Sequence, residues 1–504
     1  MLDLILIFML LNVLYVLFYQ GKNDTKFLKN IISFSGLIFV ITTFLLSLFD
    51  KSTVQPQFTE SIIINILKYP LNHSEWSLNI SYMNLQEFGV DGLSIFFILL
   101  TTFLSFFCFL DIWSAKKAMN NLREFILYFL ILELFLVIAF ITLDLLIFYI
   151  FFESVLIPMF LIIGIWGSRE RKIRADFYLF LYTLFGSIFL FFAILILFFE
   201  AYSTKFFILY GIFFSFEKEC LLWCFSFLAF SIKIPMFPFH VWLPEAHVEA
   251  PTSGSVVLAG LLLKLGGYGC LRVILPLFPN ASYHFFPLIS VLCIVSIIYA
   301  SLTTIRQVDL KRIIAYSSVA HMNVVLVGIF TCNMYGIQGS IFLMLAHGIV
   351  SSALFFMVGL LYKQHGTRLL SYYGGLVFKM PLFSLYLLIF CLANAGTPGT
   401  CNFIGELMIF VSLIDNNFFV LFLVVLSVIL SVAYTMWFYN KIIFGNVKIN
   451  FIQNWVDLDK KNNLIYVLFV ILTLFFGLFP NQIFDVTNVS SFYITELMRF
   501  KSAY

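Results

Sequence analysis

The sequence has little charge and none of the cofactor-binding motifs of soluble redox enzymes. Only 11% of its 504 residues are charged, and the formal net charge is +3. It contains no glycine-rich nucleotide loop, and of its eight scattered cysteines only Cys220 and Cys224 lie close together. That spacing is not one that metal or iron–sulfur sites normally use. We therefore expect no cofactor, metal ion or nucleic acid to bind this chain, and redox chemistry would have to occur in other chains.

Long apolar runs take the place of polar sequence, since 62% of the residues are hydrophobic. Each run is long enough to cross roughly 30 Å of hydrocarbon as a helix, and none alternates as the strands of a membrane β-barrel do. The sequence predicts an all-α polytopic membrane protein with about fourteen spans. The predicted spans are 3–19, 28–49, 91–112, 124–142, 144–166, 174–199, 220–240, 252–274, 286–305, 313–331, 337–361, 381–414, 418–440 and 464–480.

Two predicted spans are interrupted. Pro235 and Pro238 follow Lys233 at the end of one apolar run, and a short polar connection is expected from 240 to 251. The run 381–414 is too long for one span and contains AGTPGTCNF, so we expect it to form two half-helices. In a membrane, broken backbone is tolerated where it packs inside protein or lines a wet cavity. Residues 50–90 should form the largest loop, and 486–504 a surface helix.

The basic residues are distributed unevenly between the two faces. With odd-numbered connections on one face, that face holds 20 of the 29 lysines and arginines and the other holds seven. The positive-inside rule makes the basic face the matrix or cytoplasmic side and places both termini opposite. Phenylalanine is unusually abundant, at 66 residues. This bias is typical of an A- and T-rich organellar gene.

Seven titratable side chains fall inside apolar spans, where a charge costs roughly 2.5–3.5 kcal/mol on insertion scales. In chain order they are Glu133, Glu153, Lys233, Lys264, His321, His347 and Glu406. No metal-ligand spacing connects them. We interpret the row as a proton relay, in which Glu153 keeps Lys233 charged and its withdrawal releases the lysine's proton toward Lys264.

Structural alternatives remain open for each of these groups. Lys233 could snorkel to an interface, and the carboxylates or histidines could be interhelical contacts. For His240 and His247 in the polar connection, a structural or capping role is favoured over relay. Asp91 and Asp144 lie near span ends, where an interfacial or capping role is also favoured.

Several segments resemble the antiporter-like membrane subunits of respiratory complex I. These are KIPMFPFHVWLPEAHVEAPTSGSVVLAGLLLKLGGYGCLR, QVDLKRIIAYSSVAHM, GTPGTCNFIGE and FESVLIPMF, and the similarity covers roughly residues 85–445. The resemblance implies fourteen helices with two inverted five-helix repeats, in which the seventh and twelfth helices are broken. It divides the chain into helices 1–3 (1–112), a first repeat (113–274), a second repeat (275–445) and a C-terminal helix with a tail (446–504).

The resemblance also implies a function and a role for each charged group. Glu153 and Lys233 would pair in a first half-channel, Lys264 would be the central lysine, His321 and His347 would extend the polar axis, and Glu406 would end it, with Glu133 less firmly matched. The chain would translocate protons in the mitochondrial inner membrane beside other antiporter-like subunits and lipid. NADH, FMN, iron–sulfur clusters and ubiquinone would be held by the rest of the complex.

Three other functions share parts of this pattern. The chain could be a subunit of a multi-subunit cation/proton antiporter, a membrane subunit of a hydrogenase-type complex, or a scaffold that no longer pumps. The phenylalanine bias and the glutamate at position 406 argue against the antiporter. The complete row of buried charges argues against the scaffold, because burying charge costs free energy.

Overall fold

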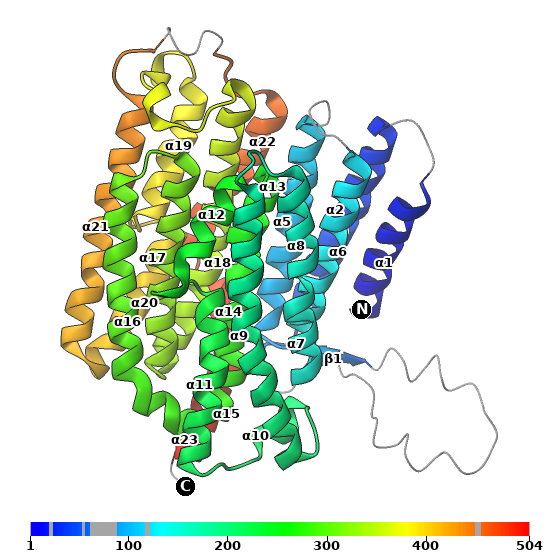
Figure 1. Cartoon of the computed structure of the whole chain (residues 1–504), viewed down its shortest axis with the longest axis vertical. Helices are drawn as coiled ribbons and strands as arrows, with labels where there is room; N and C mark the ends of the chain where they lie inside the picture. The colour runs from blue at the N-terminus through cyan, green and yellow to red at the C-terminus, as the bar shows by residue number, and fades with distance from the viewer. Residues whose placement is uncertain are drawn as a thin grey trace.

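The chain is a bundle of long, roughly parallel and antiparallel helices (Figure 1). The computed structural model describes residues 2–19, 24–52, 56–60, 88–115, 121–448 and 455–502. Within these residues, eleven helical segments are long and apolar enough to cross a membrane. With the shorter α1 and the two broken helices they give fourteen spans, so the predicted all-α membrane fold is confirmed.

The helices follow the predicted spans closely. The first half contains α1 (Leu2–Phe18), α2 (Asp24–Ser47), α5 (Ser94–Ala115), α6 (Leu122–Ile141), α7 (Leu145–Ser154), α8 (Leu156–Trp166), α9 (Lys172–Ala201), α10 (Phe206–Tyr210), α11 (Phe216–Lys233) and α12 (Trp242–Glu249). The next helix combines α13 (Thr252–Val257), α14 (Leu263–Gly269) and α15 (Leu275–Leu277). The rest comprises α16 (Pro279–Arg306), α17 (Leu310–Phe330), α18 (Met334–His365), α19 (Pro381–Asn394), α20 (Cys401–Asn416), α21 (Phe418–Ile443), α22 (Lys460–Leu478) and α23 (Asn481–Ser502).

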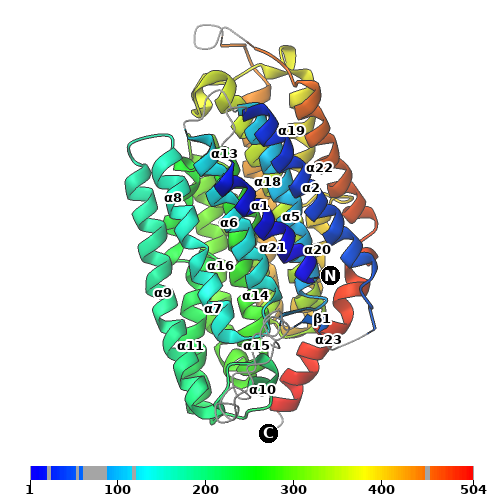
Figure 2. The same ribbon diagram turned by 90° about the vertical axis from the view of Figure 1, so that its right-hand side faces the viewer.

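Burial separates central helices from outer ones. The helix 252–277 and α18 are buried along their whole apolar windows, and α17 nearly so. By contrast, only 28% of the apolar window is buried in each of α2, α21 and α22. Figure 2 shows α1 and α2 on the outside of the bundle, with α18 behind them. Because lipid is as apolar as these exposed side chains, the outer helices need no water-soluble face.

The first broken helix differs from its prediction in one respect. Helix α11 ends at Lys233, as the following prolines require. The segment 240–251, predicted as a polar connection, is instead a short 3₁₀ turn (Phe239–Val241) followed by the buried helix α12. The indole of Trp242 donates to the Ile232 carbonyl at 2.9 Å, so α12 supplies a hydrogen bond that the break would otherwise remove. The prediction was wrong because HVWLPEAHVEA carries two histidines and two glutamates, as a polar connection would, yet forms a helix that packs inside the bundle.

The second broken helix lies between α19 and α20. Gly396 and Gly399 adopt φ values of 72° and 88°, in the left-handed region that glycine tolerates. The prediction of two half-helices within 381–414 is confirmed.

The helix 252–277 has a feature that the sequence did not predict. Two of its segments, Leu258–Leu262 and Cys270–Ile274, are π-helical.

Glycines in LLLKLGGYG allow two helices to approach closely. A Cβ on Gly266 would lie 2.5 Å from Ile234 Cγ1, and one on Gly269 would lie 2.2 Å from the Phe230 ring. Phe230 lies in the last turn of α11 and Ile234 directly follows its end, so these glycines let α14 pack directly against the break at Lys233. Lys233 and Lys264 are therefore brought to the same part of the bundle by small residues.

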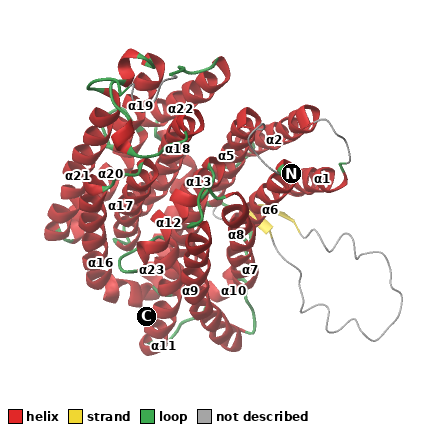
Figure 3. Cartoon of the chain, turned by 45° about the horizontal axis from the view of Figure 1, so that its top comes forward, coloured by secondary structure: helices red, strands yellow, loops and turns green. Residues whose placement is uncertain are grey.

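The connection between α2 and α5 lies mostly outside the described residues, and so does the predicted loop 50–90. Its ends form a two-stranded antiparallel ribbon of β1 (Gln57–Glu60) and β2 (Phe88–Val90), drawn in yellow in Figure 3. The predicted surface helix 486–504 is present as α23 but starts earlier, at Asn481. It buries Ile483, Val486 and Met498 against the bundle.

Candidate functional site

Glu133 is held by a neighbouring hydroxyl. It lies on α6, is 3% exposed, and its Oε1 accepts a hydrogen bond of 2.7 Å from Ser105 on α5. The two helices pack side by side within the apolar core, so this hydrogen bond offsets part of the cost of burying the carboxyl group. Among the described residues, no cation lies within ion-pair distance of Glu133.

Glu153 and Lys233 lie near each other without a direct contact. The Lys233 ammonium at the end of α11 donates to the backbone carbonyl of Phe152 at 2.8 Å and lies 3.8 Å from the centre of the Phe152 ring. Glu153 is the next residue along α7, so its carboxyl group follows the carbonyl that binds Lys233. Within the described part of the chain, however, no ion pair of 4 Å or less joins them, and Glu153 Oε1 is buried without a hydrogen-bond partner. The lysine is thus bound to the peptide beside the carboxylate.

Lys264 lies in the middle of the buried helix 252–277 and is fully enclosed. Its ammonium donates to the Ala259 carbonyl at 2.5 Å and lies 2.9 Å from His347 Nδ1 on α18. Ala259 belongs to the π-helical segment, where the backbone carbonyls are displaced from regular α-helical pairing. The π-helix therefore places a carbonyl acceptor beside the lysine, and His347 provides a second one.

His321 and Glu406 continue this row. His321 Nδ1 on α17 lies 3.2 Å from Glu406 Oε1 on α20, and both side chains are almost fully buried. The other ring nitrogen, Nε2, lies 3.4 Å from the hydroxyl of Tyr434 on α21. The rings of His321 and His347 are 5.8 Å apart, centre to centre. Gly396 at the second helix break faces Glu406, because a Cβ there would lie 2.5 Å from Oε2.

The seven predicted residues therefore fall into two groups. The linked group consists of Lys264, His347, His321 and Glu406, which are joined by two polar contacts and a pair of adjacent imidazoles. The separated group consists of Glu133, Glu153 and Lys233, which have no direct contact with one another among the described residues. Chemically, an ammonium, two imidazoles and a carboxyl group in contact can exchange protons without a metal ion. The described residues contain no cluster of three or more metal-ligating side chains.

Sequence reasoning missed the neutral partners of these groups. Ser105 and Tyr434 are ordinary polar residues in apolar helices, and only the packing shows that they touch Glu133 and His321. A single serine in an apolar helix gives no sequence signal that it contacts a buried carboxyl group.

Sequence reasoning also counted two buried cations among the basic residues of the connections between spans. Lys311 and Arg368 were counted as basic loop residues, yet each is 1% exposed. Lys311 donates to the Ala250 carbonyl at 2.6 Å, and Arg368 donates to the Val248 carbonyl. His247 is fully buried and stacks on Phe355 at 4.7 Å between ring centres. Lys311 and Arg368 therefore pair with backbone carbonyls at the end of α12, where a helix leaves acceptors without intrahelical partners.

Comparisons with known proteins match this chain to one family. Residues 142–432 match the family model described as NADH:quinone oxidoreductase/Mrp antiporter, transmembrane. A Marchantia polymorpha protein named NADH-ubiquinone oxidoreductase chain 4 is 47% identical over 93% of this chain and 92% of its own length. A Chondrus crispus protein of the same name is 50% identical, over 81% of this chain and 83% of its own.

Solved structures agree in fold. A chain of respiratory complex I from Thermus thermophilus with bound NADH superimposes with a TM-score of 0.85 at 26% identity, covering 99% of this chain and 100% of that one. A chain of an Mrp complex from a Dietzia species gives a TM-score of 0.84 at 16% identity, covering 99% and 98%. The second likeness concerns the fold alone.

Proposed function

Because this chain belongs to the family of membrane subunits shared by NADH:quinone oxidoreductases and Mrp antiporters, we propose that it is a core membrane-arm subunit of NADH:ubiquinone oxidoreductase, the counterpart of chain 4 in its relatives. Its task in that complex is to translocate protons across the membrane. Electron transfer from NADH to ubiquinone in other chains supplies the energy, since each elementary charge moved against 100 mV costs about 2.3 kcal/mol. NADH, FMN, iron–sulfur clusters and ubiquinone are bound by those other chains.

The observation that carries this proposal is the linked group at membrane depth. Lys264 and His347 are in contact at 2.9 Å, and His321 and Glu406 at 3.2 Å. All four are nearly or fully enclosed in the bundle. Burying four titratable groups in hydrocarbon is costly, and such residues are normally retained for transport or proton relay.

Proton movement along the linked group follows from its geometry. The Lys264 ammonium gives a proton to His347 Nδ1, and His347 releases a proton from Nε2 on the far side of its ring. His347 Nε2 is buried without a hydrogen-bond partner among the described residues, so it is available for this second transfer. A water molecule or a ring rotation bridges the 5.8 Å to His321. His321 then passes a proton to Glu406, whose carboxyl group releases it at the end of the row.

The separated group controls when Lys264 receives a proton. Lys233 is held by the Phe152 carbonyl, and a carboxylate on the adjacent residue, Glu153, favours the charged form of a nearby lysine. When Glu153 is drawn away or neutralised, that support is lost and Lys233 yields its proton toward Lys264. A charge change at Glu153 therefore starts the transfer.

The orientation, repeats and partners remain parts of this proposal. The basic face is toward the mitochondrial matrix, and both termini are toward the intermembrane space, in keeping with the positive-inside rule. The two five-helix repeats span residues 113–274 and 275–445, each containing one broken helix. Neighbouring antiporter-like subunits pack against the apolar outer faces, and lipid covers the remainder.

The decisive experiment compares Lys264→Ala with the parent in an assembled complex reconstituted into sealed vesicles. We expect NADH-driven proton pumping to fall about 100-fold, the scale on which a positioned proton donor contributes. The matched control is Lys218→Ala, which removes an exposed lysine on α11 and should leave pumping unchanged. Assembly is checked on native gels. Unchanged pumping in an assembled Lys264→Ala complex would refute the relay.

The same vesicles distinguish the antiporter alternative. If the chain works in a cation/proton antiporter, a sodium gradient alone should drive proton exchange without NADH. If it works in NADH:ubiquinone oxidoreductase, proton movement should require NADH and stop when ubiquinone reduction is inhibited.

A further inference from the structure

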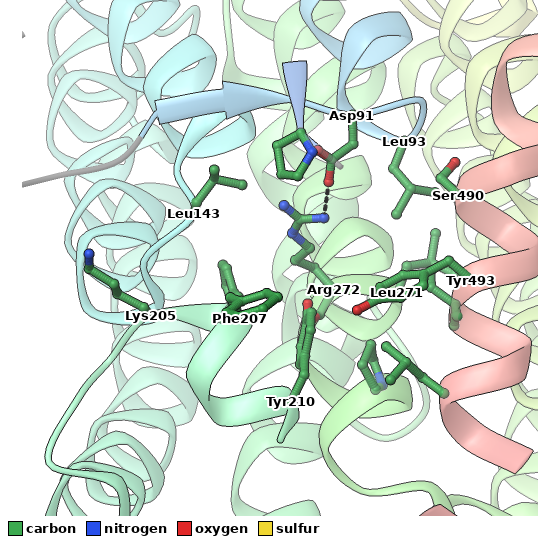
Figure 4. Close-up of a pocket in the computed structure, with 15 residues that line it drawn as sticks. Asp91, Leu93, Leu143, Lys205, Phe207, Tyr210, Leu271, Arg272, Ser490 and Tyr493 are labelled. Atoms are coloured by element: carbon green, nitrogen blue, oxygen red, sulfur yellow. Dashed lines mark hydrogen bonds and ion pairs between the residues drawn. The ribbon is translucent and has the colours of Figure 1, made fainter. Parts of the chain in front are cut away.

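Helix α5 runs antiparallel to the buried helix 252–277 and is bound to it near both ends. At one end, Thr252 Oγ1 donates to Asp111 Oδ2 at 3.0 Å. At the other end, Arg272 forms an ion pair with Asp91, which lies just before the first turn of α5 (Figure 4). The two contacts are equally far apart along both segments, so the segments are held in register over their length.

The contact at Asp111 also includes α18, the helix of His347. Lys363, in the last turn of α18, donates to Asp111 Oδ1 at 2.6 Å, while Thr252 donates to Oδ2. One carboxylate on α5 therefore binds both helices whose side chains meet at the 2.9 Å contact between Lys264 and His347.

Between its ends, α5 packs against glycines of the same two helices. A Cβ on Gly260 would lie 2.4 Å from Leu104 Cδ1, and one on Gly348 would lie 2.8 Å from Leu100 Cδ2. Gly260 belongs to the π-helical segment 258–262, and Gly348 lies on α18. Helix α5 therefore touches the π-helical segment itself as well as both ends of the helix that contains it.

The π-helical segment 258–262 determines where Lys264 points. The lysine binds the carbonyl of Ala259, five residues before it, which the π-helical turn displaces from regular α-helical pairing. A π-helical turn holds one residue more than an α-helical turn, so its loss would rotate the helix beyond it by about 100°. Such a rotation would turn Lys264 away from His347.

The two contacts with α5 oppose this rotation. Thr252 precedes the π-helical segment and Arg272 follows it, so a rotation at the segment would turn one of them away from its partner on α5. Arg272 and Asp91 are only 8% and 9% exposed, and separating them would leave a buried charge without its partner, which is strongly destabilising. The contacts therefore favour the register in which Lys264 meets His347.

We propose that Asp91 and Asp111 are positioning residues for proton transfer. Through their contacts with the two ends of the helix 252–277, they keep Lys264 against His347. In this role neither aspartate passes a proton itself. The inference rests on the proposed relay, because it explains how the geometry at Lys264 is maintained.

The first test breaks the ion pair and measures NADH-driven pumping per assembled complex in sealed vesicles. Asp91→Asn removes the counter-charge of Arg272, and we expect pumping to fall about tenfold to 100-fold, because a misplacement of about 1 Å can cost on the order of 100-fold. Asp91→Glu keeps the carboxylate and should retain most of the pumping. The matched control is Arg499→Ala, which breaks an exposed ion pair with Glu496 and should leave pumping unchanged.

The second test changes the other contact without removing a charge. Thr252→Val keeps the shape of threonine but cannot donate to Asp111, and pumping should fall about fivefold. Thr252→Ser keeps the hydroxyl and should retain most of the pumping. Because neither variant leaves a buried charge unpaired, both should assemble as the parent does on native gels.

A double-mutant comparison separates positioning from general destabilisation. In a Lys264→Ala background, Asp91→Asn and Thr252→Val should cause no further loss of NADH:ubiquinone turnover, because they act through the lysine. Further losses in that background would overturn the proposal. Normal pumping by Lys264→Ala would refute the relay, whereas a loss in Lys264→Ala without a loss in assembled Asp91→Asn and Thr252→Val complexes would refute only the positioning role.

Discussion

The separated and linked groups contain similar chemistry but are built differently. In the linked group, charged and titratable side chains contact one another, at 2.9 Å between Lys264 and His347 and at 3.2 Å between His321 and Glu406. In the separated group, Glu133 and Lys233 are each held by a neutral partner, whereas Glu153 Oε1 is buried without a hydrogen-bond partner among the described residues. Ser105 holds Glu133, and the Phe152 carbonyl holds Lys233.

The difference implies a division of labour. A contact between titratable groups lets a proton move when the donor is charged, so in the proposed relay the linked group needs only a water molecule or a ring rotation between His347 and His321. A lysine bound to a backbone carbonyl cannot pass its proton to that carbonyl, because the amide oxygen is a very weak base. The separated group therefore needs a movement of Glu153 or of water before transfer starts, which makes it suitable as a gate.

Interrupting the linked group should have the largest effect. His321→Leu removes the imidazole between His347 and Glu406 and leaves no titratable group to bridge them. We expect NADH-driven pumping to fall about 100-fold, measured as the initial rate of vesicle acidification. His321→Gln, which keeps hydrogen bonding without a titratable nitrogen, should fail equally. Pumping restored by the glutamine would show that His321 only supports packing.

Lys233→Ala should have a smaller but clear effect on the separated group. The variant removes a charge-assisted hydrogen bond worth about 1.5 kcal/mol or more, so we expect pumping and coupled turnover to fall at least about tenfold. Lys233→Arg separates charge from proton transfer, because arginine keeps the charge but does not release a proton.

The gate interpretation makes a specific forecast for the arginine variant. Lys233→Arg should assemble as the parent does on native gels and still fail to pump. If Lys233→Ala pumps normally in an assembled complex, the lysine is structural, and the gate assigned to the separated group is wrong.

Much of this architecture could be predicted from apolar run length and helix breakers. The position of Lys233 before two prolines predicts the end of α11, and glycines 396 and 399 predict the second break. The buried helix α12 could not be predicted, because its short sequence carries a histidine and two glutamates and follows two prolines, and only packing against α9 and α17 reveals its burial.

The site could be predicted as a set of residues but not as two groups. Burial cost alone identifies each charge in an apolar span as unusual. Which charges touch depends on rotamers and on the π-helical segment at Ala259, and neither follows from spacing. The expected close pair of Glu153 and Lys233 illustrates the limit, because the ammonium instead contacts the adjacent Phe152 carbonyl.

Ser105→Ala should have the smallest effect on pumping. It tests whether a neutral partner in the separated group takes part in proton transfer. The Ser105 hydroxyl lies 2.7 Å from Glu133 Oε1 and 3.0 Å from the Thr102 carbonyl and can donate its one proton to either, and alanine removes the bond to the carboxyl group. A neutral hydrogen bond contributes about 1 kcal/mol, so pumping should change by no more than about fivefold. Ser340→Ala is the control, because within the described part of the chain that buried hydroxyl donates to the Ile337 carbonyl of its own helix and to no other group. If Ser105→Ala lowered pumping as much as His321→Leu does, neutral partners would also conduct protons. The separated group would then be a second proton path.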